Sequence, residues 1–244
     1  MKRQQLIDLL DSEIIDFKEM VGKCSVVPSS IPILWFGNIE DYFHSDLKII
    51  TVSLNPSDIE FKSSKSSEPA TALRFPDYNG TSISLFDSLN KYFSFNPYNA
   101  WFKASFGAVL GSFEASHDGK LKNAALHTDI GSPYATSPTW TGLSTSERTI
   151  LESKGSRSWH RLVQILEPDI ILFSASKNYE KKILFPQVKG WDFIDVKAKS
   201  PLLKGNFLIS EEKTSTVLFQ VQGRKPFLKT SKEEKMKFSK HVDK

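Results

Sequence analysis

Four groups of polar residues follow apolar runs of the sequence, at points where buried strands are expected to end. The groups begin at Asn55, His127, Ser174 and Gln222. In the stretch "IITVSLNPS", an apolar and β-branched run stops at Asn55, and Pro56 follows at once. An amide can orient a water, whereas an imidazole or a carboxylate can exchange a proton or read hydrogen-bonding groups. These residue types predict a polar site built at strand ends.

Several other chemistries lack their sequence signatures. The five histidines show no HxH or HExxH spacing, and no GxGxxG, GxxxxGK[ST] or GxSxG motif occurs. The lone cysteine, Cys24, excludes an internal disulfide and any four-thiolate cluster. We therefore expect no metal site and no small-molecule cofactor.

The elements that would position the polar groups alternate between strands and helices. Buried strands are predicted at 47–54, 123–130, 169–176, 191–198, 206–210 and 215–223. Helical spacing of apolar residues predicts helices at 1–20, 82–95, 98–113 and 177–185, one or two helices at 143–168, and a basic helix at the C-terminus. Ser82 or Ser84 is available to cap the second of these helices. A long polar stretch at 56–82 has no period, which is typical of a functional or mobile loop.

Apolar strands alternating with amphipathic helices indicate an α/β fold. We expect a three-layer α/β/α sandwich, with a mainly parallel central sheet of about four or five strands. No repeat or linker is evident, so we expect a single domain over residues 1–244. Ligands of such sheets bind beyond the carboxyl ends of the strands, where the polar groups would converge on one crevice.

Composition and charge are those of an ordinary globular protein. Hydrophobic residues make up 39% and charged residues 25% of the 244 residues. No apolar run approaches the ~20 residues that cross a bilayer, and acids interrupt the N-terminal segment, so we expect a cytoplasmic protein without membrane contact. Residues 221–244 carry eight Lys or Arg against three acids, whereas the total net charge is +4. This basic end is either a footprint for phosphates or a solvated terminal helix.

At this point the sequence resembles the uracil-DNA glycosylase superfamily. "SLNPS" is similar to the first motif of its mismatch-specific and single-strand-selective branches, which reads Gly-Ile-Asn-Pro-Gly or Gly-Met-Asn-Pro-Gly. Three further stretches follow in the family's order: "ALRFPDYNG", "ALHTDIGSPYATSPTW" and "EPDIILFSAS". "FQVQGRKPF" occupies the place of the closing His-Pro-Ser motif. It lacks the histidine, and Gln222 is the nearest polar substitute.

The resemblance implies a monofunctional DNA glycosylase that leaves an abasic site. Asn55 would orient the water beneath C1′ of the sugar, and Pro56 would fix the turn that presents it. Phe75 would stack on the flipped base. His127 and Gln222 complete the expected catalytic set, with Gln222 or Arg224 donating to the base O2 in place of the missing histidine.

The remaining expected roles concern the base and the DNA strand. Base contacts are expected from Phe75, Asp129, Ser53 and Asn79. DNA contacts are expected from Ser57, Ser174, Gly223, Arg224, Lys225 and Phe227, with Phe227 or Pro226 as a wedge in the duplex. The expected partner is DNA, bound by a monomer.

Asp129 stands where the uracil enzymes of this superfamily carry asparagine. An ionised carboxylate only accepts hydrogen bonds, so it would repel O4 of uracil and pair with the N4 amine of cytosine. The sequence thus favours a cytosine-derived or otherwise modified pyrimidine, and the resemblance allows a role in anti-phage defence. On this interpretation Asp129→Asn raises activity on uracil and lowers activity on aminated bases.

Other interpretations of the same residues stay open. Asn55 also suits an Asx-turn before proline, Asp129 suits a turn cap, and Phe75 suits the core. His127 lies on the same strand face as Asp129 if the strand is regular, where a structural histidine is an equal alternative to a catalytic one. The alternative functions are a uracil or mismatch repair glycosylase, a non-catalytic nucleic-acid-binding relative, and a nucleoside or nucleotide hydrolase.

Overall fold

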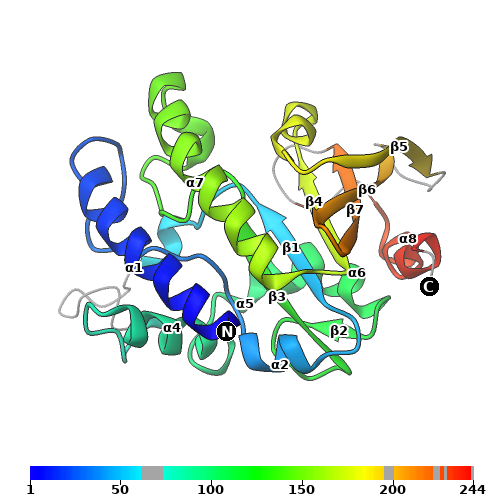
Figure 1. Ribbon diagram of the computed structural model, residues 1–244, viewed down its shortest axis with the longest axis horizontal. Helices are drawn as coiled ribbons and strands as arrows, with labels where there is room; N and C mark the ends of the chain where they lie inside the picture. Colours follow the sequence, from blue (N-terminus) through cyan, green and yellow to red (C-terminus); the bar gives the residue numbers. More distant parts are fainter. Residues whose placement is uncertain (62–73, 195–200, 222–225, 228–229, 243–244) are drawn as a thin grey trace. The chain divides into compact units, whose positions relative to one another are not determined.

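The computed structural model describes residues 1–61, 74–194, 201–221, 226–227 and 230–242 (Figure 1). Contacts group the chain into two compact units of three segments each. The first unit comprises Met1–Gly37, Leu54–Pro97 and Thr128–Ile165, and the second comprises Asn38–Ser53, Tyr98–His127 and Leu166–Lys244. The segments of the two units alternate along the chain, so no linker marks the division. That is why the sequence pattern predicts one domain.

The second unit contains the sheet, apart from the last two residues of β3. Its described strands run in the order β2-β3-β1-β4-β7-β6-β5. Their bounds are β1 Ile49–Ser53, β2 Ala115–Ser116, β3 Asn123–Asp129, β4 Ile170–Ala175, β5 Gln187–Ile194, β6 Leu202–Ser210 and β7 Lys213–Val221. The fold is therefore α/β with a mostly parallel central sheet, as predicted. The sheet has seven strands rather than four or five, partly because β2 is too short to leave a sequence pattern.

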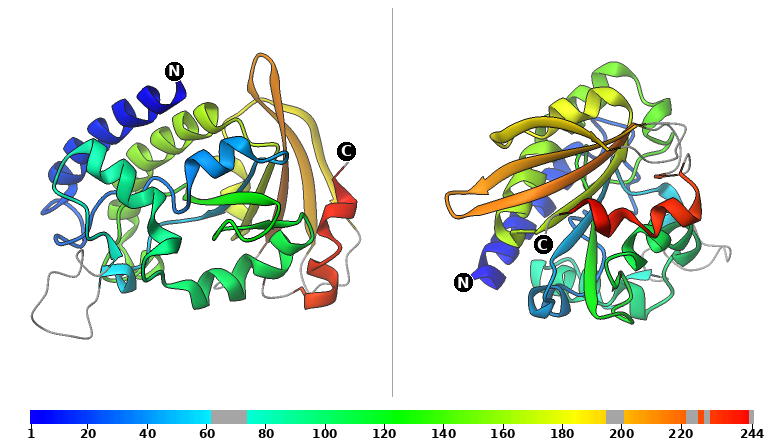
Figure 2. Two further views of the ribbon diagram at one scale, coloured as in Figure 1. Left: turned by 90° about the horizontal axis from the view of Figure 1, so that it is seen from below. Right: turned by 90° about the vertical axis from the view of Figure 1, so that its right-hand side faces the viewer.

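Parallel pairing in the middle of the sheet aligns three of the predicted strands. Ile49 of β1 pairs with Ile170 of β4, and Ile170 pairs in turn with Thr216 of β7. All six residues of β4 are buried, as expected of a central parallel strand. β6 and β7 are antiparallel and form a hairpin (Figure 2). Buried apolar residues of this unit form one core cluster: Ile49, Phe106, Val109, Leu110, Phe113, Ala115, Ala125, Ile170, Leu172, Leu202, Leu218, Phe227 and Phe238.

β5 is the last strand in the order and pairs with β6 in an antiparallel ladder that is interrupted by two register shifts. Val188 and Phe193 are 63% and 78% exposed. The ring of Trp191 in β5 packs closely on Gly205 in β6: a Cβ atom on Gly205 would lie only 2.9 Å from this ring. This contact holds β5 to the sheet.

The helices of the second unit are mostly short. They are α2 Ile39–His44, α5 Asn99–Phe102, η3 Lys103–Gly107, α6 Ala108–Gly111, η5 Lys177–Lys182, α8 Lys232–Lys235 and η6 Phe238–His241. The expected helix at 177–185 is a 3-10 helix, and the expected basic C-terminal helix is two separate short pieces. Asn38 caps α2 by accepting from the backbone N–H groups of Glu40 and Asp41.

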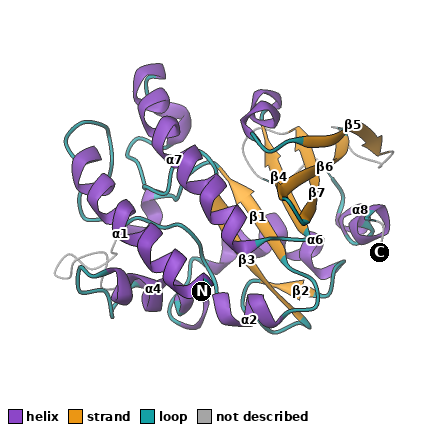
Figure 3. Cartoon of the chain, viewed as in Figure 1, coloured by secondary structure: helices purple, strands orange, loops and turns teal. Residues whose placement is uncertain are grey.

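The described part of the first unit consists of helices, loops and the end of β3, and its three longest helices are among those drawn in purple in Figure 3. These are α1 Lys2–Met20, α4 Ser82–Asn90 and α7 Thr145–Leu166, whose last residue belongs to the second unit. The shorter turns are η1 Asp58–Phe61, η2 Tyr92–Ser94 and η4 Trp140–Gly142. α1 packs against α4.

Local capping sets where two of these helices begin. Thr81, rather than Ser82 or Ser84, caps α4, because its hydroxyl accepts from the backbone N–H of Ser84 at 3.2 Å. Ser144 and Glu147 form a reciprocal capping box at the start of α7. Among the described helices, none is both long and apolar enough to cross a membrane.

Candidate functional site

Asn55 lies in the first unit, two residues beyond the end of β1. Its Nδ2 atom donates to the backbone oxygen of Tyr134 at 3.3 Å and to the hydroxyl of Thr136 at 3.1 Å. These two bonds use both amide hydrogens. Within the described part of the chain the Oδ1 atom accepts no hydrogen bond. The amide is thus held in one orientation with a free acceptor.

The segment that holds Asn55 is itself tied to the residues around it. The backbone oxygen of Leu54 accepts from the N–H groups of Gly131 and Ser132, both at 2.9 Å. Ser57 pairs with Thr136 in a parallel bridge. A side chain at position 131 would bring its Cβ within 2.6 Å of the Leu54 oxygen, so this close approach needs glycine. The turn after β1 is therefore fixed on both sides of Asn55.

Glu60, in η1, is a buried carboxyl that the sequence did not single out. It is 4% exposed, and its Oε2 atom accepts from the hydroxyl of Tyr92 at 2.7 Å. The Nε atom of Arg74 lies 3.3 Å from the same oxygen. Burial raises the pKa of Glu60 to about 7, although Tyr92 and Arg74 both favour the ionised form. Glu60 can therefore exchange a proton near neutral pH.

Asp129 ends β3 and belongs to the first unit, as Glu60 does. It is 5% exposed. Burial raises the pKa of Asp129 well above its usual range, and the negative charge of Glu60 raises it further. A neutral carboxylic acid donates through its O–H and accepts through its carbonyl oxygen. The raised pKa of Asp129 favours this neutral form, whereas the first interpretation takes the carboxylate as ionised and only accepting.

Phe75 lies in an aromatic stack of the first unit. Its ring centroid is 6.0 Å from that of Phe61 and 5.7 Å from that of Tyr92, with interplanar angles of 23° and 28°. The side chain is 1% exposed. Phe75 is therefore a packed residue in this conformation, and a base reaches its face only if a neighbouring ring moves.

Asn79, the last of the expected base contacts in the first unit, forms hydrogen bonds within the turn that precedes α4. Its Oδ1 atom accepts from the backbone N–H and the hydroxyl of Thr81, and its backbone N–H donates to Ser84. These bonds hold the start of α4.

His127 lies in the second unit within a buried pair of histidines. The hydroxyl of Thr51 is 2.8 Å from Nδ1 of His127 and 2.9 Å from Nε2 of His117. The ring of Trp101 lies 5.4 Å from that of His127. Burial lowers the pKa of His127 well below its usual value and that of His117 to about 3. Both imidazoles are neutral at physiological pH, so they can share protons with Thr51 but carry no charge.

Ser174 and Phe227 meet in the second unit, but as core residues. The backbone N–H of Phe227 donates to the Ser174 hydroxyl at 3.2 Å, and the Phe227 ring packs on those of Phe106 and Phe238. Phe227 is 0% exposed. Phe227 is therefore a packed core residue in this conformation, and the wedge role expected of Phe227 or Pro226 stays a prediction.

The remaining residues expected to contact the base or the DNA, or to take part in catalysis, are Ser53, Gln222, Gly223, Arg224 and Lys225. Ser53 ends β1 and is partly buried. Gln222, Gly223, Arg224 and Lys225 lie outside the described residues. Gln220, two residues earlier, is buried and donates to Thr230 at 2.6 Å. The first unit thus brings together Asn55 with Ser57, and Asp129 with Glu60 and the Phe75 stack.

The described residues contain no group of three or more His, Cys, Asp or Glu side chains that could hold a metal ion. Comparisons with protein-family models, curated proteins and solved structures found no match for this chain.

Proposed function

We propose that this chain is a monofunctional DNA glycosylase that hydrolyses the bond between deoxyribose and a flipped pyrimidine, leaving an abasic site. The observation that carries the proposal is the amide of Asn55, which has both N–H groups engaged and its oxygen free. Such an oxygen can accept from a water and hold it beneath C1′ of the sugar. The three-layer α/β/α arrangement of the uracil-DNA glycosylase superfamily is part of the same proposal.

In the proposed reaction the water adds its oxygen to C1′ as the bond from C1′ to the base breaks. The bonding electrons leave with the base, which gains the proton that the water loses. Asn55 orients the water without adding charge, and the oxocarbenium-like sugar needs no protein nucleophile. We therefore expect no Schiff base, and borohydride should trap no covalent complex with DNA.

The proposed substrate is a cytosine-derived, modified pyrimidine, which a neutral Asp129 can bind through other hydrogen bonds than an ionised carboxylate makes. The O–H of a neutral Asp129 can donate to N3 of cytosine while its carbonyl oxygen accepts from the N4 amine. The same acid can donate to O4 of uracil and accept from N3–H. A DNA panel carrying uracil, cytosine and methylated, hydroxymethylated or glucosylated cytosine, scored for released base, identifies the substrate. A cytosine-derived substrate would suit the proposed role in anti-phage defence.

The test of the mechanism is Asn55→Ala on the DNA that wild type cleaves. Turnover should fall by about 10²-fold or more, because the water loses its orientation, and the dissociation constant for DNA should change little. Asn38→Ala is the matched control: it removes a helix cap, worth about 1 kcal/mol, but leaves the proposed site intact. Equal turnover in wild type and Asn55→Ala removes Asn55 from the mechanism.

A non-catalytic nucleic-acid-binding relative is the second candidate, and the closed packing around Phe75 favours it. Such a protein would bind DNA in a gel-shift assay yet release no base from any member of the panel. A hydrolase of free nucleosides would instead release base from nucleosides and none from the DNA panel.

A further inference from the structure

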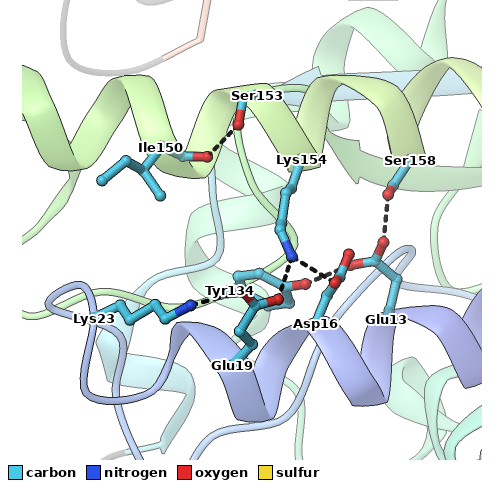
Figure 4. A network of polar contacts seen from close by, with 9 residues as sticks. All are labelled: Glu13, Asp16, Glu19, Lys23, Tyr134, Ile150, Ser153, Lys154 and Ser158. Atoms are coloured by element: carbon cyan, nitrogen blue, oxygen red, sulfur yellow. Dashed lines mark hydrogen bonds and ion pairs between the residues drawn. The ribbon is translucent and has the colours of Figure 1, made fainter.

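A buried carboxyl joins α1 and α7, the two longest helices described in the first unit (Figure 4). Glu13 of α1 is 1% exposed and accepts hydrogen bonds from two hydroxyls. The hydroxyl of Tyr134 donates to its Oε2 atom at 2.7 Å, and Ser158 of α7 donates to its Oε1 atom. Burial raises the pKa of Glu13, while these two donors favour the ionised form. An apolar side chain would fill the same space without this desolvation cost, so stability alone does not account for the carboxyl.

A second set of contacts joins the same two helices without touching Tyr134. Lys154 of α7 forms ion pairs of 2.6 Å with Asp16 and Glu19 of α1 (Figure 4). Lys154 is more exposed than the Glu13 carboxyl. α1 and α7 are therefore joined by a buried clamp (Glu13, Tyr134 and Ser158) and by a second clamp (Lys154, Asp16 and Glu19). Only the buried clamp includes Tyr134.

Tyr134 links the buried clamp to Asn55. Its hydroxyl donates to Glu13, while its backbone oxygen accepts from Nδ2 of Asn55 at 3.3 Å. Its backbone N–H donates to the hydroxyl of Ser132, whose own N–H donates to Leu54. Fixing the Tyr134 side chain therefore also fixes the carbonyl oxygen that holds the Asn55 amide.

We propose that Glu13 is a positioning residue for Asn55, acting through Tyr134 to hold the amide in the orientation that leaves Oδ1 free. The inference rests on the proposed role of Asn55. A hydrogen bond to a buried carboxylate is directional, so it fixes the position of the tyrosine more closely than apolar packing does. Displacement of a catalytic group by about 1 Å can lower a rate about 10²-fold.

The experiment compares Tyr134→Phe with Lys154→Met. Tyr134→Phe keeps the ring that packs on Phe17 but removes the hydroxyl, whereas Lys154→Met breaks the second clamp between the same helices. For Tyr134→Phe we expect kcat to be about tenfold lower, with KM for DNA unchanged. In NMR spectra we expect the Asn55 side-chain ¹⁵NH₂ signals to have altered chemical shifts and faster hydrogen exchange with water. Lys154→Met should change both readouts much less, because the Lys154 charge acts on Glu13 without a direct hydrogen bond. Glu13→Gln keeps an acceptor for Tyr134 and should lie between wild type and Tyr134→Phe.

The two readouts separate this inference from the proposed function. If wild type releases no base from any DNA, the glycosylase proposal fails, but the amide signals still report on the Tyr134 linkage. Unchanged Asn55 signals in Tyr134→Phe overturn the inference. Equal effects of Tyr134→Phe and Lys154→Met also overturn it, because they would show that Glu13 only clamps the helices.

Discussion

Glu60 should make the unfolding free energy fall as pH rises from 4.5 to 7. Its pKa rises from 4.5 to about 7 on folding, mainly through burial. A raised pKa contributes stability that is complete below pH 4.5 and is lost as pH passes through 7. At about 1.4 kcal/mol for each pH unit, the loss over this window is about 3 kcal/mol.

Glu60→Gln removes this contribution, together with the smaller part of the Asp129 pKa shift that the Glu60 charge causes and that acts in the same direction. Glutamine keeps an acceptor for the Tyr92 hydroxyl but cannot ionise. The unfolding free energy of the variant minus that of wild type should therefore rise by about 3 kcal/mol between pH 4.5 and 7 and level off above that. His117, whose pKa is lowered to about 3, makes both proteins less stable as pH falls below 6.5, and this effect cancels in the difference.

Urea unfolding followed by circular dichroism at half-unit steps from pH 4.5 to 8.5 measures the difference. Glu212→Gln, at an exposed turn residue, is the matched control for replacing one glutamate by glutamine. If the difference in unfolding free energy between Glu60→Gln and wild type does not change with pH, the buried environment assigned to this carboxyl is refuted. If this difference falls as pH rises, the ion pair with Arg74 outweighs the cost of burial.

Two further outcomes are expected. Thr51→Val should lower the unfolding free energy by about 1–3 kcal/mol in urea titrations, because the hydroxyl shared by His117 and His127 is lost; a change below ~0.5 kcal/mol would contradict this. Asp129→Asn should keep the rank order of bases in the DNA panel, since a neutral acid and an amide each offer a donor and an acceptor. A shift toward uracil in that variant would show that Asp129 is ionised and restore the first interpretation.

The sequence predicts the middle of the sheet well, for a physical reason. β1, β3 and β4 are apolar runs that end in a polar residue or a turn, and burial on both faces makes that pattern continuous. β2 has two residues and leaves no pattern. The sequence predicts Ser82 or Ser84 as the cap of α4, whereas Thr81 caps it, because all three are good caps and only backbone geometry separates them.

The candidate site is less predictable because its chemistry depends on contacts between distant residues. The charge of Asp129 is set by burial and by Glu60, which is 69 positions away in the sequence. Nothing in "DIEF" marks Glu60, and nothing in "GSPYAT" marks Tyr134 as the partner of Asn55. Phe75 and Phe227 belong to a residue type that is more often packed than functional, and both are packed here.

The alternation of segments between the two units has a consequence for how the chain folds. The chain crosses from one unit to the other five times. Neither unit is therefore complete until residues beyond 160 have been synthesised. The contacts that close each unit therefore span long sequence separations, which slows folding and leaves apolar segments exposed meanwhile. No single truncation isolates either unit, because a chain cut after residue 165 keeps the whole first unit but still carries residues 38–53 and 98–127 of the second.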